Sequence, residues 1–200
     1  MSVSDQQPAP PRVVVLAGPN GAGKSTAAPY LLPSGMPFVN ADEIAKQLPA
    51  SYPGNRDMEA GRILLRQLDG FEETRTSFAV ETTLASRSLA PRIQRLRGAS
   101  GYRFLLIYLW LPAPDLSIER VAARVRRGGH DIPADTIRRR YEAGLHNFFA
   151  LYRPLADRWR VYQNSSLGRP QLIASGGAGA ERTRVTNREI WTRIKEQTLR

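Results

Sequence analysis

The strongest chemical signal in the sequence is a glycine-rich segment at residues 18–25, which reads Gly-Pro-Asn-Gly-Ala-Gly-Lys-Ser. It matches the phosphate-loop pattern G-x-x-x-x-G-K-[ST] at every fixed position and directly follows an apolar run at residues 13–16. The backbone N–H groups of such a loop point into one concavity, and the helix that follows adds its positive end, so the loop binds phosphates. Lys24 is expected to reach the β- and γ-phosphates of a nucleotide, and the Ser25 hydroxyl is expected to bind Mg²⁺. The predicted nucleotide-binding residues are Gly18, Pro19, Asn20, Gly21, Ala22, Gly23, Lys24, Ser25 and Thr26.

Two carboxylates follow apolar runs that are expected to be strands, and ligands of open parallel sheets bind beyond such strand ends. Asp42 comes just after residues 37–40 and could accept a proton from an acceptor hydroxyl as it attacks the γ-phosphate. The alternative is a carboxylate at a helix start that only stabilises the helix dipole. Glu81 ends the run at residues 77–81, with Thr83 close behind. It could hold Mg²⁺ through water, grip the acceptor or simply face solvent, and the sequence leaves these roles open.

Basic charge is concentrated in one segment. The chain has a net charge of +11, carried almost entirely by arginine, and seven arginines stand between residues 120 and 140. Arg120, Arg124 and Arg127 are spaced to share one helix face, where they could close over transferring phosphates. We select Arg124 and Arg127 as catalytic candidates. A solvated helix face is the alternative explanation for these arginines.

Apolar runs alternate with helical patterns along most of the chain, which predicts an α/β protein. The runs are at residues 13–16, 37–40, 77–81, 103–111, 160–163 and, more weakly, 171–174. We expect a P-loop NTPase fold, with a parallel sheet of five or six strands and helices on both faces. Residues 1–11 are predicted to be a disordered tail and residues 12–200 a single P-loop kinase domain. Within that domain, two helical patterns at residues 115–153 are predicted to form an arginine-rich lid, and residues 175–180 a glycine-rich loop.

Composition excludes several classes of site and protein. The chain has no cysteine and two histidines, which removes disulfides and thiolate metal sites and makes a multi-histidine metal centre improbable. No N-K-x-D tetrapeptide is present to read guanine, which argues against a GTPase. The longest apolar run, residues 104–111, is too short to span a bilayer, and the polar start lacks the apolar stretch of a signal peptide. We therefore expect a cytoplasmic protein without a membrane partner.

Taken together, the motifs resemble those of the zeta toxin kinases over about residues 12–174. The segments that carry the resemblance are GPNGAGKST, FVNADEIA, VETTLAS, RVRRGGHDIP with IRRRYE, and VYQNSS. The resemblance implies an ATP- and Mg²⁺-dependent kinase that phosphorylates a sugar hydroxyl of UDP-N-acetylglucosamine and is restrained by a small helical antitoxin. It makes Lys24 the phosphate lysine, Asp42 the base, and Glu81 with Thr83 the contacts to the acceptor. Arg87 corresponds to an arginine that the family places shortly after that threonine.

Two other functions remain open at this point. A polynucleotide 5′-hydroxyl kinase would suit the net charge of +11. A non-enzymatic switch, in which ATP merely orders the lid, would use the same loop. We expect a kinase acting on a hydroxyl of a small anionic molecule rather than on nucleic acid.

Overall fold

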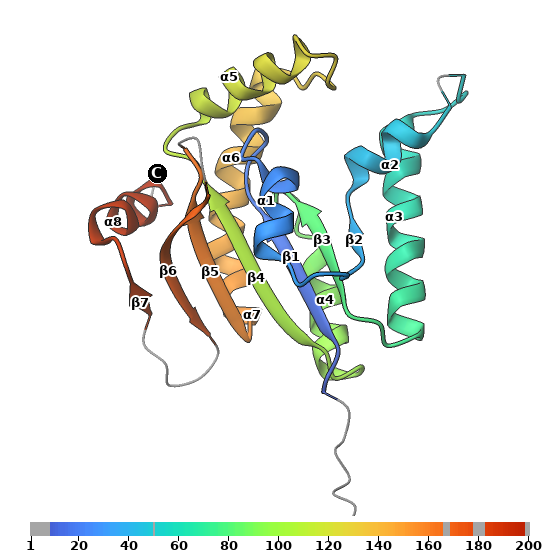
Figure 1. Ribbon diagram of the computed structural model, residues 1–200, viewed down its shortest axis with the longest axis horizontal. Helices are drawn as coiled ribbons and strands as arrows, with labels where there is room; N and C mark the ends of the chain where they lie inside the picture. The colour runs from blue at the N-terminus through green and yellow to red at the C-terminus, as the bar shows by residue number, and fades with distance from the viewer. Residues whose placement is uncertain (1–8, 50, 166–168, 178–182, 199–200) are drawn as a thin grey trace, which may run out of the picture.

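The computed structural model describes residues 9–49, 51–165, 169–177 and 183–198. These residues form one seven-stranded sheet with the spatial order β2-β3-β1-β4-β5-β6-β7, flanked by helices (Figure 1). The strands are β1 (Arg12–Ala17), β2 (Phe38–Val39), β3 (Phe78–Thr82), β4 (Arg103–Trp110), β5 (Arg158–Gln163), β6 (Gln171–Gly177) and β7 (Arg184–Val185). The helices are α1 (Lys24–Leu31), α2 (Ala41–Gln47), α3 (Arg56–Glu73), α4 (Leu89–Gly98), α5 (Pro114–Val125), α6 (Ala134–Asn147), the π-helix η1 (Phe148–Tyr152), α7 (Arg153–Leu155) and α8 (Arg188–Gln197).

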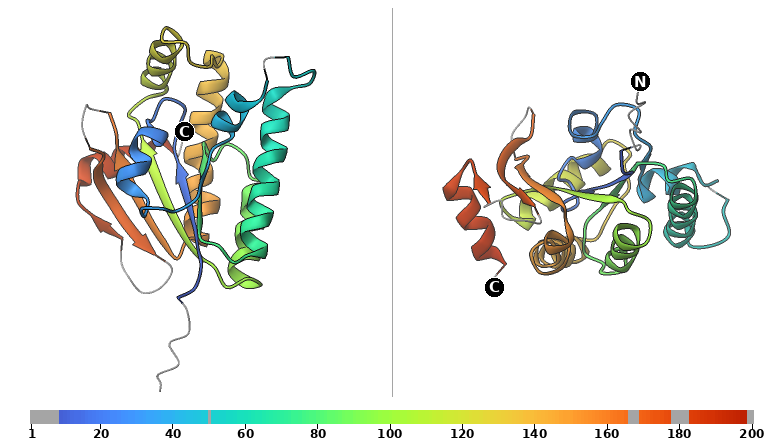
Figure 2. Two further views of the ribbon diagram at one scale, coloured as in Figure 1. Left: turned by 45° about the vertical axis from the view of Figure 1, so that its right-hand side comes forward. Right: turned by 90° about the horizontal axis from the view of Figure 1, so that it is seen from below.

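The central strand β1 is buried on both faces, as its continuous apolar run predicts. Val13 and Val15 pack into one core cluster, and Val14 and Leu16 pack into the other. The first cluster includes residues of α4 and α6 and the second includes residues of α1, so helices cover both faces of the sheet (Figure 2). The α/β class predicted from the sequence is confirmed.

The sheet differs from the prediction in strand number and in its far edge. It has seven strands among the described residues, where five or six were expected, and β6 and β7 run antiparallel to their neighbours. β7 is only two residues long, too short to produce an alternating pattern. The predicted glycine-rich loop is also wrong at its start, because residues 175–177 belong to β6, while residues 178–180 lie outside the described residues. Gly176 fits there because its missing side chain leaves room for the ring of Trp159.

Most of the predicted tail, residues 1–8, also lies outside the described residues. Residues 9–11 form neither helix nor strand, but Pro11 is buried and its carbonyl accepts a hydrogen bond from the Arg103 amide. This bond ties the residue before β1 to the first residue of β4. None of the helices in the described ranges is both long and apolar enough to cross a lipid bilayer.

The segment predicted as a lid divides into two parts with different surroundings. Val121 of α5 packs with Ile132 and Ile137 in a small cluster of its own, away from the two main cores. In contrast, Leu145 and Phe148 lie in the main core, where they cover the sheet face that α4 also covers. Of residues 115–153, α5 and the turn after it stand over the phosphate loop, whereas most of α6 and η1 belong to the folded core (Figure 1).

At the opposite end of the sheet, Asp157 joins three elements. Its carboxylate accepts two hydrogen bonds from the Arg97 guanidinium of α4, at 2.8 and 3.2 Å, and one from the Phe104 amide of β4 at 2.7 Å. Burial by itself raises the pKa of Asp157, but the hydrogen bonds from Arg97 and Phe104 outweigh it and hold the pKa below its ordinary value. The carboxylate therefore contributes to stability while it is ionised.

Replacing this carboxylate tests its contribution. Asp157→Asn should lower the free energy of unfolding by about 1–3 kcal/mol at neutral pH, because Arg97 loses its charged partner. Since the folded-state pKa is below the unfolded value of about 3.9, this contribution is present above that value and is lost as the pH falls through the folded-state pKa. Urea unfolding of both proteins should therefore give a stability difference that shrinks below about pH 4. A difference that stays constant into acid would contradict the assignment.

Candidate active site

The phosphate loop connects β1 to α1 and is held from outside by the loop that follows β5. The Asn164 Nδ2 of that loop donates to the Ala22 carbonyl at 2.7 Å. Gly23 has a φ of 75°, and a Cβ at this position would lie 2.8 Å from the Asn164 Nδ2. The backbone conformation therefore favours glycine at position 23, and a side chain there would also displace the Asn164 amide.

Lys24 lies folded over its own loop, with 7% of its side chain exposed. Its Nζ donates to the carbonyls of Gly18 at 2.9 Å and Pro19 at 3.1 Å, and lies 3.7 Å from a carboxylate oxygen of Glu81. Burial lowers the pKa of Lys24, an effect that the negative charges of Glu81 and Asp42 oppose. The lysine is thus held at the phosphate loop with its charge compensated by an acidic partner.

Ser25, Asn40 and Glu81 form a polar network that joins the start of α1, the end of β2 and β3. The Ser25 hydroxyl donates to the Glu81 Oε2 at 2.8 Å, and the Asn40 Nδ2 donates to the same oxygen at 2.9 Å. Glu81 lies beside the loop because β3 pairs with β1 in a register that sets Leu16 against Glu81. The Asn40 side-chain oxygen in turn accepts the Asp42 amide at 2.8 Å and caps α2. One asparagine therefore links the phosphate loop to the helix that carries Asp42.

Asp42 itself is exposed in the first turn of α2 and lines a cavity of about 360 Å³. The phosphate loop forms one wall of this cavity. Asn40 caps α2, so the Asp42 carboxylate is not needed as the helix cap, and Asp42 lines the cavity. Outside the phosphate loop and α1, the other polar or charged residues that line it are Asn40, Glu43, Lys46, Glu81, Arg120, Arg124 and His130.

The two arginines of α5 that reach the cavity have different surroundings. The Arg120 guanidinium donates to the carbonyls of Gly21 at 3.3 Å, Asn164 at 2.8 Å and Ser165 at 2.8 Å. It braces the phosphate loop against the loop after β5. Arg124 is half-buried and donates to the His130 carbonyl at 2.8 Å, and its positive charge adds to the lowering of the Lys24 pKa that burial mainly causes. Arg124 is thus close enough to the phosphate-loop lysine for their charges to interact.

The structure does not bring the second arginine candidate, Arg127, into this cavity as the described residues define it. Its spacing from Arg120 and Arg124 predicts a shared helix face, but α5 ends at Val125. Gly128 then adopts a φ of 81° in the turn that follows, and Arg127 is exposed. Helical spacing ceases to predict direction where the helix has already ended.

The remaining sequence candidates, Thr83 and Arg87, lie on the loop between β3 and α4. Thr83 is half-buried and Arg87 is exposed, and neither is among the residues that line the cavity. The loop begins just after Glu81 and Thr82, the last residues of β3, and Glu81 lines the cavity. The contact of Thr83 and Arg87 with an acceptor stays a prediction.

Sequence reasoning missed three parts of the site: the bridging role of Asn40, the brace formed by Arg120, and Asn164. Asn40 and Asn164 both come directly after a parallel strand, and the rule that strand ends carry ligand contacts could have found them. No pattern shows that Arg120 binds backbone carbonyls, because its partners are 44 and 99 residues away.

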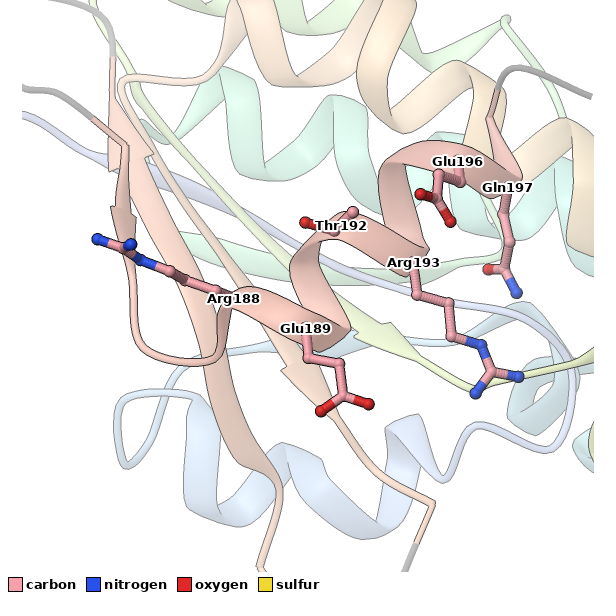
Figure 3. Close-up of a pocket in the computed structure, with 6 residues that line it drawn as sticks. All are labelled: Arg188, Glu189, Thr192, Arg193, Glu196 and Gln197. Carbon is pink, nitrogen blue, oxygen red and sulfur yellow. The ribbon is translucent and has the colours of Figure 1, made fainter.

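A larger hollow, of about 740 Å³, lies along α8 (Figure 3). Its labelled side chains come from this one helix and mix both signs of charge. Gln197 at its end accepts a hydrogen bond from the Trp110 indole at 3.0 Å and donates to the Pro112 carbonyl at 2.8 Å. These contacts attach α8 to the sheet, and the hollow lacks the phosphate-binding features of the smaller cavity.

Comparisons with known proteins agree with this geometry. An uncharacterised protein of Haemophilus influenzae is 30% identical over 132 residues, which are 65% of this chain and 92% of that protein. A chain of the AvrRxo1-ORF1:-ORF2 structure with ATP superposes with a TM-score of 0.72 at 19% identity, covering 95% of this chain and 65% of that chain. The PezAT toxin-antitoxin structure of Streptococcus pneumoniae gives 0.60 at 15% identity, covering 98% and 89%.

The chain thus spans about two thirds of the length of the AvrRxo1 chain and most of the PezAT chain. At these identities the structures establish the fold alone, which is the α/β fold with a phosphate loop that the sequence predicted. The family is established separately, because residues 2–169 match the Zeta toxin family. Since that match covers most of the sequence and agrees with its motifs, the protein belongs to the zeta toxin family.

Proposed function

We propose that the protein is a kinase that transfers the γ-phosphate of ATP to a hydroxyl of a small anionic acceptor, with UDP-N-acetylglucosamine as that acceptor. The observation that carries the proposal is the single cavity in which Lys24, Ser25 and Glu81 face Asp42 and Arg124. Such a cavity combines a phosphate cradle, a proton acceptor and a guanidinium charge, which are the parts that phosphoryl transfer needs. The family and the ATP in the AvrRxo1 structure support the choice of nucleotide.

The donor set at the phosphate loop also fits Mg²⁺. The Ser25 hydroxyl and the Glu81 carboxylate are hard oxygen donors only 2.8 Å apart, of the type that Mg²⁺ prefers. Bound Mg²⁺ would neutralise charge on the β- and γ-phosphate oxygens. Ser25 would hold it directly and Glu81 through water, because the Glu81 Oε2 is already engaged by Ser25 and Asn40. These contacts favour the metal side of the site for Glu81 over a grip on the acceptor.

Three residues that line the cavity would have separate roles in the transfer, namely Lys24, Asp42 and Arg124. Lys24 would turn from the carbonyls of Gly18 and Pro19 to the phosphates, while Glu81 keeps its charge compensated. Asp42 would take the proton from the acceptor hydroxyl, a role that needs an accessible carboxylate at the cavity mouth. Arg124 would stabilise negative charge on the transferring group from the opposite wall.

A protein partner belongs to the proposal as well. AvrRxo1-ORF1 was solved in complex with ORF2, and PezAT is a toxin-antitoxin system. We therefore include a small antitoxin that restrains this chain, as the sequence resemblance implies. A polynucleotide 5′-hydroxyl kinase stays as the second candidate because the net charge of +11 favours a polyanion.

Incubation of the purified protein with ATP, Mg²⁺ and UDP-N-acetylglucosamine should add one phosphate to the sugar nucleotide, seen by mass spectrometry. Lys24→Ala should reduce this transfer by roughly 10²-fold or more while the protein stays folded, because the loop loses its phosphate contact. A 5′-hydroxyl oligonucleotide serves as the competing acceptor. Phosphorylation of the oligonucleotide alone would replace the proposed acceptor by nucleic acid.

The role of Asp42 is tested by Asp42→Asn, which keeps the size of the side chain but removes the base. Transfer should fall by ~10²-fold or more, because the acceptor hydroxyl loses its proton acceptor. The affinity for ATP, measured by calorimetry, should change little, since Asp42 belongs to α2 and not to the phosphate loop. A collapse of ATP affinity would assign Asp42 to the nucleotide instead.

The two arginine candidates can be separated by parallel replacement. Arg124→Ala should slow transfer by about tenfold or more, and Arg124→Lys should restore part of it, because an ammonium lacks the planar fork of a guanidinium. Arg127→Ala should stay within about twofold of the wild type, since this side chain is exposed and is not among those that line the cavity. Equal losses at both positions would show that helical spacing, and not the end of α5, decides which arginines act.

A further inference from the structure

The loop between β3 and α4 carries Thr83 and Arg87, and one helical segment holds it by its backbone. The Asn147 Nδ2 of α6 donates to the Leu84 carbonyl at 2.8 Å and to the Ala85 carbonyl at 3.3 Å. The Tyr152 hydroxyl of η1 donates to the Ser86 carbonyl at 2.8 Å. Three consecutive carbonyls of the loop therefore have buried side-chain donors from the same segment.

The backbone of α6 also lies very close to the loop. A Cβ at Gly144, one turn before Asn147, would collide with the Thr83 carbonyl. Glycine at this position lets the backbone of α6 reach the loop directly. Gly144, Asn147 and Tyr152 thus contact every residue from Thr83 to Ser86.

The loop adopts a conformation that it would not keep on its own. Leu84 has a φ of 58°, in the left-handed region, and its side chain is fully buried. This conformation costs a non-glycine residue roughly 1–2 kcal/mol, so it persists only where the surroundings impose it. The hydrogen bonds from Asn147 and the burial of the Leu84 side chain supply that constraint.

The π-helix explains how two residues five positions apart reach the same loop. In a regular α-helix they would point about 140° apart around the axis, because each residue advances about 100°. Here the Arg153 amide donates to the Phe148 carbonyl, an i to i+5 bond that widens the turn. The wider turn brings the Tyr152 side chain round toward the side on which Asn147 lies. Such turns are frequent at functional sites.

We propose that Asn147 and Tyr152, together with Gly144, are positioning residues that hold the loop at residues 83–87 in the shape that presents Thr83 and Arg87 to the acceptor. The inference rests on the proposed kinase function for its catalytic consequence, but the holding of the loop does not depend on it. Burial raises the pKa of Tyr152 to about 12, so its hydroxyl stays a hydrogen-bond donor at neutral pH.

Tyr152→Phe is the cleanest test, because it removes one hydroxyl and keeps the ring in the core. Its matched control is Tyr102→Phe, which also removes a hydroxyl that donates to backbone carbonyls, those of Phe71 and Thr76, far from the site. Asn147→Leu has a similar volume without the donor and forms the stronger variant. All three should unfold cooperatively, with similar losses of stability for the two tyrosine variants.

The catalytic readout is the KM for UDP-N-acetylglucosamine measured against the KM for ATP. Tyr152→Phe should raise the acceptor KM about threefold or more and Asn147→Leu about tenfold or more, with the ATP KM within about twofold. Tyr102→Phe should change neither constant. A general loss of folding would lower the apparent kcat and leave both KM values unchanged, so a selective rise in the acceptor KM identifies positioning. Folded variants with wild-type constants for both substrates would overturn the inference.

Hydrogen exchange at the amides of residues 84–88 tests the loop without any substrate. Exchange should be faster in Tyr152→Phe and Asn147→Leu than in the wild type and unchanged in Tyr102→Phe. Unchanged exchange in all variants would overturn the inference even if the wild type is an active kinase. If the wild type does not phosphorylate the sugar nucleotide, the proposed function fails and the exchange result alone decides whether these residues hold the loop.

Discussion

The carboxylate of Glu81 is the contact on which the geometry of the site depends. It compensates the charge of the buried Lys24, accepts the Ser25 hydroxyl and binds the Asn40 amide. A buried ammonium without such a partner would cost several kcal/mol, so the lysine of the phosphate loop needs this acidic neighbour. The position of Glu81 is set in turn by the parallel pairing of β3 with β1, which ends at the phosphate loop.

The hairpin formed by α5 and α6, residues 114–147, supports two loops of the site. On the nucleotide side, Arg120 of α5 ties the phosphate loop to the loop after β5. On the other side, Asn147 at the end of α6 holds the loop that leaves β3. The hairpin can do both because α6 is anchored in the main core while α5 stands on a small cluster of its own. The support of the β3–α4 loop and the two arginines that line the cavity therefore come from one continuous segment.

The sequence predicts those parts of the site that local pattern controls. The phosphate loop, the buried central strand and the acidic residues at strand ends all follow from short-range spacing, and the structure gathers Lys24, Ser25, Asp42 and Glu81 around one cavity. Helical spacing fails for Arg127 because α5 ends at Val125, two residues before it, and the turn that follows carries Gly128 at a positive φ. The second helical pattern in residues 115–153 correctly predicts the helix α6. Helical periodicity, however, does not tell whether a helix covers a sheet or forms a lid. No sequence pattern predicts the π-helix η1, so the hydrogen bond from its Tyr152 to the β3–α4 loop can be recognised only in the structure.

The most direct test of the account is to supply ATP labelled at the γ-phosphate together with a cellular extract of small molecules. The account predicts that the label moves to a small anionic compound, and that Asp42→Asn blocks this transfer while still binding ATP. Label released only as inorganic phosphate, at the same rate in the wild type and in Asp42→Asn, would contradict the account, because the cavity would then hydrolyse ATP without an acceptor or a base.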